Sequence, residues 1–172
     1  MSKLELIQKL KEAELVKTGE FILKSGLKSH VYFDLKGMVS YPELLYQTSV
    51  ELSKMITDQD VVVAGVPLGA ISFACHVSKI TNLPMVLVRE NKKTYGLQNV
   101  IEGNTFGKEL ILIEDVVTTG GSVMKTVEIL ESEGVKIRKI IIILDRGNGA
   151  IDLIRKKGYI CETLFQIQEF ME

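Results

Sequence analysis

Apolar residues in the first third of the chain recur at intervals that predict two helices with a pair of strands between them. Four of them have the spacing of one face of an amphipathic helix: Leu4, Ile7, Leu10 and Leu15. Short apolar runs at 21–23 and 31–33 flank the turn-like pair Ser25-Gly26 and predict two strands. Pro42 predicts the start of a second helix, whose inner side carries Leu45, Leu52, Met55 and Ile56.

Beyond residue 60 the apolar residues form continuous runs, as in strands that are buried on both faces of a parallel sheet. The predicted strands are 61–66, 85–88, 110–113 and 137–144. Helices are predicted between them, one over 69–80 and one from Val123 to Gly134. This alternation predicts an α/β fold with a parallel sheet. The length of 172 residues suits a single domain over 1–172, with a hood at about 1–39 and a core at about 40–150.

Composition and charge narrow the class of protein. The formal net charge is −1, so the chain has no built-in attraction for nucleic acid or for an anionic membrane. The strongest apolar run, 140–144, is far too short to span a bilayer, and the N-terminus does not resemble a secretory signal. Cys75 and Cys161 predict two buried, reduced thiols, and His30 and His76 stand apart from any zinc-binding spacing. We therefore expect a cytoplasmic protein.

Parallel α/β sheets bind ligands beyond the carboxyl ends of their strands, which directs attention to the residues after 113. Two acids, Glu114 and Asp115, end that strand, and a small turn with two threonines and two glycines leads into the next helix. Backbone N–H groups at such a turn can hold a phosphate, and the acids suit sugar hydroxyls or Mg²⁺. The alternative is a capped helix behind two exposed acids. A P-loop is excluded because the Walker lysine is absent.

The segment 111–122 resembles the phosphoribosyl pyrophosphate (PRPP) signature of the type I phosphoribosyltransferases. That resemblance implies a Rossmann-like core in which the two acids hold the ribose hydroxyls and the turn wraps the 5′-phosphate. The PRPP-binding residues that it implies here are Glu114, Asp115, Val116, Val117, Thr118, Thr119, Gly120, Gly121 and Ser122. Asp115 is also expected to take part in catalysis.

The polar segment 89–107 reads either as a solvated surface loop or as an active-site lid. It resembles a loop of the orotate phosphoribosyltransferase family, which implies that Arg89, Lys93 and Tyr95 bind PRPP. Arg89 and Lys93 are the expected catalytic residues that stabilise the departing pyrophosphate. Glu90 stands where the family usually has a lysine, and the neighbouring Lys92 is not part of the usual pattern. The resemblance also implies a homodimer in which loop 89–107 reaches into the neighbour's site.

The N-terminal segment 21–37 resembles the hood of the same family and thereby indicates the nucleobase. The resemblance implies that Lys24 contacts orotate and PRPP, and that Tyr32 and Phe33 lie against orotate, with Thr118 and Arg146 as further orotate-binding residues. The alternatives are core packing for the two aromatics and a surface ion pair for the arginine. The turn 67–70 occupies the position of the family's pyrophosphate loop but lacks its aromatic and its lysine.

The resemblance as a whole implies transfer of ribose 5-phosphate from PRPP to orotate, giving orotidine 5′-phosphate and pyrophosphate for UMP synthesis. Mg²⁺ is the implied cofactor, held mainly by PRPP with no direct protein ligand, and Asp115 is a candidate contact through water. Two other functions stay open at this stage. One is a phosphoribosyltransferase for uracil or a purine, and the other is a non-catalytic regulator that binds PRPP.

Overall fold

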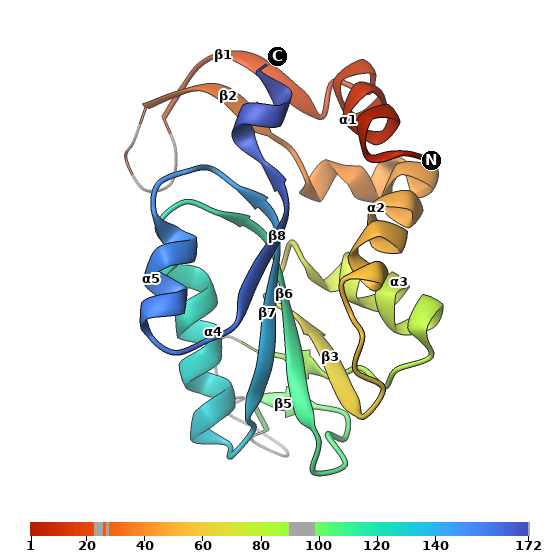
Figure 1. Cartoon of the computed structure of the whole chain (residues 1–172), viewed down its shortest axis with the longest axis vertical. Coiled ribbons are helices and arrows are strands. Elements are labelled where there is room, and N and C mark those ends of the chain that lie inside the picture. Colours follow the sequence, from red (N-terminus) through yellow and green to blue (C-terminus); the bar gives the residue numbers. More distant parts are fainter. Residues whose placement is uncertain (23–25, 27, 90–98, 172) are drawn as a thin grey trace.

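The computed structural model of this chain describes residues 1–22, 26, 28–89 and 99–171. Within these residues, four parallel strands form the central sheet in the order β3-β6-β7-β8. Their bounds are Val61–Gly65, Glu109–Val117, Ile137–Asp145 and Cys161–Gln166. Helices α2 and α3 lie on one side of the sheet and α4 and α5 on the other (Figure 1). This arrangement confirms the predicted α/β fold with a parallel sheet.

The core lies on both faces of the sheet because the central strands are apolar at successive positions. Residues 110–113 of β6 and 140–143 of β7 are fully buried. Alternate residues belong to two separate apolar clusters, so Ile111 faces one layer of helices and Leu112 faces the other. Such strands are stable only between two helical layers. The bounds of the covering helices are Pro42–Lys54 for α2, Ile71–Thr81 for α3, Gly121–Ser132 for α4 and Ala150–Lys156 for α5.

The hood comes from both ends of the chain. Helix α1 (Lys3–Glu12) leads to the antiparallel hairpin of β1 (Val16–Ile22) and β2 (Lys28–Phe33), and the 3₁₀ turn η1 (Lys36–Ser40) joins the hairpin to the core. The C-terminal turn η2 (Ile167–Phe170) lies beside the hairpin (Figure 1). Its aromatic ring at 170 packs edge-on against Phe33 at 4.8 Å and Phe165 at 5.4 Å between centroids. The N-terminal hood and the last strand therefore share one aromatic cluster.

The structure corrects the sequence predictions in three places, two of them near the chain ends. Cys75, predicted to be buried, is exposed because it lies on the outer face of α3, whereas Cys161 is buried as predicted. Leu4 was placed on the inner side of the first helix but is 79% exposed, whereas Ile7 and Leu10 are buried as predicted. The expected core ended at about residue 150, yet α5 and β8 continue it, and β8 is part of the central sheet. Strand β8 carries polar residues between its apolar ones because it lies at the edge of the sheet, so it lacks the continuous apolar run of β6 and β7.

Residues of the predicted strand 85–88 pair with two different strands. Met85 forms a parallel bridge with Val63 of β3, which extends the central sheet on that side. The chain then diverges, and β4 (Leu87–Val88) pairs antiparallel with β5 (Ile101–Glu102). The second of these strands lies in the segment 89–107, which the sequence presents as a polar loop. Two residues are too few to give a readable alternation of apolar and polar positions.

The aromatic cluster beneath the hood gives a stability prediction. Replacing Phe170 by alanine should lower the free energy of unfolding by about 3 kcal/mol, because a ring that is 6% exposed leaves a cavity between Phe33 and Phe165. Met171→Ala is the matched control, since the neighbouring side chain is 64% exposed and should change stability little. Urea unfolding of both variants measures the difference. Equal stabilities would show that η2 does not hold the hood on the core.

Candidate active site

The carboxyl ends of the central strands meet beneath the hood. Figure 1 shows the hairpin of β1 and β2 above the upper ends of β6 and β7. Parallel pairing explains the convergence, since strands with the same direction end at the same edge of the sheet. The pairing of Val117 with Asp145 and the hydrogen bond from Arg146 N to Val117 O (3.1 Å) align the turns that follow β6 and β7. The turns after β6 and β7 therefore lie side by side, and their joint role in one ligand site stays a prediction.

The acid pair at the end of β6 consists of one buried and one half-buried carboxyl group. Glu114 is 3% exposed, and its Oε1 accepts a hydrogen bond from Asp115 N at 3.1 Å. Asp115 Oδ1 accepts one from Val116 N at 2.9 Å. Within the described part of the chain, Oε2 of Glu114 is buried without a hydrogen-bond partner. Such an atom is costly to bury, so it fits a ligand that brings hydroxyl groups.

Burial is the main cause of an unusual titration at this site. Burial raises the pKa of Glu114 to about 9. The side-chain hydrogen bond with Asp115 and the negative charge of Asp115 act in the same direction. The backbone hydrogen bond from Asp115 and the positive charge of Lys36 oppose the rise in pKa. Glu114 is therefore protonated near neutral pH in this structure. A carboxyl group with so displaced a pKa at the end of a sheet strand is typical of a functional site.

The turn after β3 brings backbone against this acid pair. A Cβ on Gly69 would overlap Asp115 Oδ2 and lie 2.5 Å from its Cγ, so glycine is required for this close approach. The same Cβ would lie 3.1 Å from Lys36 Cε, which places a side chain of η1 at the same point. The peptide bond between Pro67 and Leu68 in this turn is cis. The sequence had assigned this turn only a backbone contact, and it had not indicated Lys36.

The turn after β6 has open backbone donors at the start of a helix, where the sequence predicts a phosphate site. Gly120 has a φ of 81° and stands at the N-cap of α4 without a side-chain cap. Helix α4 has 12 residues, and the N–H groups of its first turn have no intrahelical acceptor. Thr118 is half-buried, whereas Thr119 and Ser122 are exposed beside the open backbone donors. These groups can hold a phosphate, with the helix dipole favouring its negative charge. Val116 and Val117 join this turn to the strand.

The two aromatic residues predicted to lie against orotate differ in exposure. Tyr32 and Phe33 are adjacent in β2, so their side chains lie on opposite faces of the strand. Phe33 is 5% exposed and faces the aromatic cluster, while Tyr32 is 42% exposed and packs against Phe21 at 5.5 Å. The guanidinium of Arg146 is buried, donates a hydrogen bond to Val31 O and lies 5.8 Å from the ring of Phe33. Burial lowers the pKa of Arg146.

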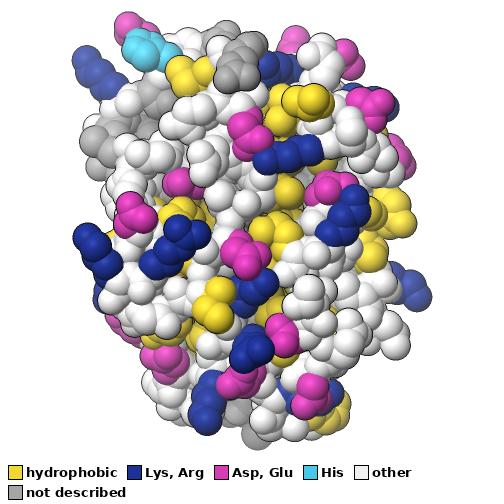
Figure 2. All heavy atoms as spheres, in the orientation of Figure 1, with side chains coloured by type: hydrophobic (Ala, Val, Ile, Leu, Met, Phe, Trp, Pro, Cys, Tyr) yellow, Lys and Arg dark blue, Asp and Glu magenta, His cyan; other side chains and the backbone are white. Residues whose placement is uncertain are grey.

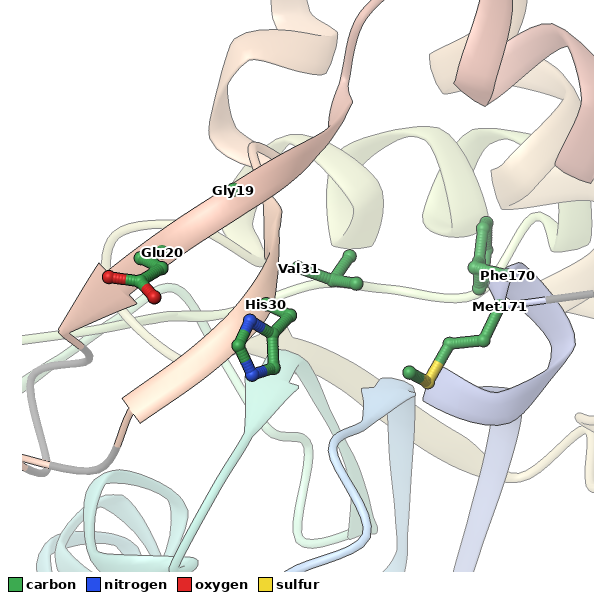
Figure 3. Close-up of a pocket in the computed structure, with 6 residues that line it drawn as sticks. All are labelled: Gly19, Glu20, His30, Val31, Phe170 and Met171. Carbon is green, nitrogen blue, oxygen red and sulfur yellow. The ribbon is translucent and has the colours of Figure 1, made fainter.

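A cavity of about 450 Å³ opens between the hairpin and η2. Figure 3 shows the imidazole of His30 on one side of this opening and the thioether of Met171 on the other. The remaining lining residues are Gly19, Glu20, Val31 and Phe170. None of them belongs to the acid pair or to the turn after β6. Val31, which lines the cavity, also accepts the hydrogen bond from Arg146.

Three of the expected site residues, Lys24, Lys93 and Tyr95, lie outside the described residues, as does Glu90. Arg89 is described, and its Nε donates to Glu102 Oε1 at 3.0 Å in the hairpin of β4 and β5. That hairpin is separate from the central sheet. The structure therefore unites the acid pair, the phosphate turn and Arg146, and it places Arg89 in a different element.

Two general surface properties complete the description. On the face drawn in Figure 2, basic and acidic side chains are interspersed rather than gathered by sign. Among the described residues, no helix has the length and apolar character needed to cross a membrane. In the same part of the chain, no cluster of three or more histidine, cysteine, aspartate or glutamate side chains could hold a metal ion.

Comparison with known proteins identifies the class to which this fold and site belong. Residues 43–170 match the family model of the phosphoribosyl transferase domain. The orotate phosphoribosyltransferase of Methanocaldococcus jannaschii is 39% identical over 168 residues, which cover 97% of this chain and 96% of that protein. The chain belongs to the orotate phosphoribosyltransferase family of the phosphoribosyltransferases.

Solved structures agree in fold. The orotate phosphoribosyltransferase from Aeropyrum pernix superposes with a TM-score of 0.78 at 27% identity, over 96% of each chain. The UMP synthase of Leishmania donovani gives a TM-score of 0.88 at 29% identity. The match covers 99% of this chain but 38% of that longer one. The type I phosphoribosyltransferase core that the sequence predicted is therefore confirmed.

Proposed function

We propose that this protein transfers ribose 5-phosphate from PRPP to orotate, forming orotidine 5′-phosphate and pyrophosphate in the synthesis of UMP. The observation that carries the proposal is the acid pair at the end of β6, beside the uncapped first turn of α4. Hydroxyl groups and a phosphate on the same ribose are spaced to meet both features at once. The family membership supplies orotate as the acceptor.

The residues of this chain would act mainly by positioning and by charge. The acid pair accepts hydrogen bonds from the 2′ and 3′ hydroxyls, while the turn 118–122 fixes the 5′-phosphate. With the ribose held at both ends, the bond from C1′ to the diphosphate oxygen breaks, and its electron pair leaves with the diphosphate. N1 of orotate, which releases its proton to solvent, forms the new bond to C1′. Positive charge develops on the ribose ring and negative charge on the leaving diphosphate, so preorganised charges of both signs lower the barrier.

Arg146 is the proposed contact on the orotate side. Its guanidinium is already held by Val31 O and lies near the ring of Phe33, which fixes its position at the end of β7. A planar guanidinium suits the planar carboxylate of orotate. Tyr32, Phe33, Thr118 and Lys24 are the further orotate contacts that we propose from the resemblance. Phe33 would act through its backbone or through Arg146, because its ring is buried in the aromatic cluster.

Mg²⁺ is the proposed cofactor, and the donor set fits it as a companion of PRPP. Asp115 is half-buried, and Glu114 has a buried oxygen without a described partner. Oxygen donors of this kind suit Mg²⁺, which binds through one or two carboxylates and substrate phosphates. When bound, the ion would neutralise charge on the diphosphate. Asp115 would contact it through water.

A homodimer is the proposed assembly, with loop 89–107 reaching the neighbour's site. Arg89 supports this arrangement, since it belongs to the separate hairpin of β4 and β5 and pairs there with Glu102. A loop that begins in that hairpin can leave the chain's own acid pair and serve another copy. Sedimentation measures the oligomeric state, and mixing of two inactive variants, one altered at Arg89 and one at Asp115, tests the sharing. Recovered activity in the mixture is the expected result.

The cytoplasm is the proposed location of this protein.

The direct test of function is the loss of orotate absorbance when purified protein is mixed with orotate, PRPP and Mg²⁺. Parallel reactions contain uracil, adenine, guanine or xanthine. We expect turnover of orotate that requires both PRPP and Mg²⁺. Turnover of another base alone would replace orotate as the substrate, while binding of PRPP without any turnover would favour a PRPP-binding regulator.

Lys93→Ala tests the proposed role of the loop. We expect turnover to fall at least about tenfold with little change in PRPP affinity, because the lysine would stabilise charge that develops as the diphosphate leaves. Lys92→Ala is the neighbouring control and should retain more activity. Steady-state kinetics with orotate and PRPP give both parameters. Turnover of the Lys93 variant equal to that of the unaltered protein would remove this residue from the mechanism.

A further inference from the structure

Lys36 lies where the turn after β3 meets the acid pair. A Cβ on Gly69 would be 3.1 Å from Lys36 Cε and 2.5 Å from Asp115 Cγ, so the three residues converge on one point. The charge of Lys36 also counters the rise in the pKa of Glu114, which places its ammonium group within electrostatic reach of that acid. No other residue of the hood is linked to the acid pair by these contacts among the residues described.

The fold fixes the backbone of Lys36 and leaves its side chain open. Leu35 and Met38 anchor η1 in the core, with 4% and 0% of their surfaces exposed. Asp34 accepts a hydrogen bond from Gly37 N at 2.9 Å and donates one from its own backbone to Leu15 O at 2.8 Å. Within the described ranges the exposed ammonium of Lys36 has no hydrogen bond or ion pair. A backbone held in place by packing, with an exposed positive charge on its side chain, is the arrangement of a ligand-binding residue.

The chemistry of PRPP requires a cation at this point. Its diphosphate is attached to C1′, the carbon next to the one that bears the 2′ hydroxyl. A ribose held by the acid pair therefore places the diphosphate beside the carboxylate of Asp115, where like charges repel. The turn 67–70, Pro-Leu-Gly-Ala, offers backbone to this diphosphate but no basic side chain. Lys36 is the hood residue that supplies a positive charge where the turn after β3 meets the acid pair.

We propose that Lys36 binds the diphosphate of PRPP, in place of a basic side chain in the turn after β3. This inference rests on the proposed function, because it takes PRPP as the ligand. The competing role is purely structural, in which Lys36 only balances the charge of the acid pair. The two roles differ in which ligands they affect. A diphosphate contact acts on PRPP alone, whereas a disturbed acid pair weakens every ligand that contains the ribose.

The experiment compares binding of PRPP with binding of ribose 5-phosphate, which lacks the diphosphate, by titration calorimetry with Mg²⁺. The variants are Lys36→Met, Lys36→Arg and the control Lys79→Met, an exposed lysine in the last turn of α3, away from the site. We expect Lys36→Met to weaken PRPP at least about tenfold, the typical effect of losing one charged hydrogen bond. Ribose 5-phosphate should bind unchanged, and Lys36→Arg should retain most of the PRPP affinity.

Two results would overturn the inference. Unchanged PRPP affinity in Lys36→Met would remove the contact, and an equal loss for PRPP and ribose 5-phosphate would assign Lys36 to the acid pair. The unaltered protein separates this test from that of the proposed function. If it binds PRPP but uses a base other than orotate, the proposed substrate fails and the Lys36 result still stands. If it does not bind PRPP, both fail.

Discussion

Replacing Gly69 by alanine is expected to lower kcat/KM for PRPP about a hundredfold, through displacement of the acid pair rather than through unfolding. The added Cβ would overlap Asp115 Oδ2 and lie 2.5 Å from Cγ, so the carboxylate has to rotate away from its present position. Asp115 is the residue that would hold a ribose hydroxyl, and a shift of about 1 Å at such a contact has a large kinetic effect. Turnover at varied PRPP concentration, together with PRPP binding by calorimetry, measures the loss.

Gly134→Ala provides the matched control for this substitution. Gly134 has a φ of 78° after the end of α4, and nothing lies within 4 Å of a Cβ placed there. Alanine at that position strains the backbone and lowers stability by about 1 kcal/mol, without touching the site. We expect its kinetics to match those of the unaltered protein. If Gly69→Ala behaved like this control, the turn after β3 would not set the position of Asp115.

Replacing Glu114 by glutamine should remove a loss of stability that the unaltered protein suffers as the pH rises. The pKa of Glu114 is raised to about 9 in the folded protein, whereas an exposed glutamate has a pKa of 4.5. Between these two values the folded protein holds a proton that the unfolded chain has released. The free energy of unfolding therefore falls with rising pH, by at most about 1.4 kcal/mol per pH unit from this group.

Between about pH 5 and about pH 8 this contribution amounts to at most about 4 kcal/mol, and Glu114→Gln should be free of it. Glutamine cannot ionise and keeps an oxygen that can accept from Asp115 N. Urea unfolding at both pH values, for the variant and the unaltered protein, measures the difference in slope. Asp152→Asn is a control, since this exposed acid on α5 should leave the slope as it is. Parallel slopes for the two proteins would mean that Glu114 is ionised in the folded state.

The same variant should bind PRPP less tightly, because glutamine has a single acceptor oxygen, which Asp115 N already uses, whereas glutamate keeps Oε2 for a ribose hydroxyl. The gain in stability and the loss of PRPP binding in Glu114→Gln would then both result from replacing one atom, the buried Oε2 that has no described partner. Binding sites commonly retain a group that lowers the stability of the fold because activity depends on it. Glutamate would be kept at this position for the ligand rather than for the fold.

Much of the fold could be predicted from the sequence because the central strands are uniformly apolar. The runs at 61–66, 110–113 and 137–144 correspond to β3, β6 and β7, and the helices between them end where Asn82 and Gly134 adopt positive φ. The phosphate turn was predictable for a related reason. Its glycines and hydroxyl residues are contiguous, so strand, turn and helix are set by one stretch of chain. Local signals of this kind survive without knowledge of the tertiary structure.

The sequence by itself thus determined the fold class, the strand ends that form the site and the acid pair at 114–115. Only the tertiary structure decided what meets that pair. Gly69 and Lys36 are 46 and 79 residues from Asp115 along the chain. Parallel pairing of β3 with β6 brings the turn of Gly69 to Asp115, and the packing of η1 brings Lys36 to the same point. It also decided that Phe33 faces inward, since its partner Phe170 lies in the last turn of the chain. Contacts between distant segments depend on packing, and spacing along one segment carries no record of them.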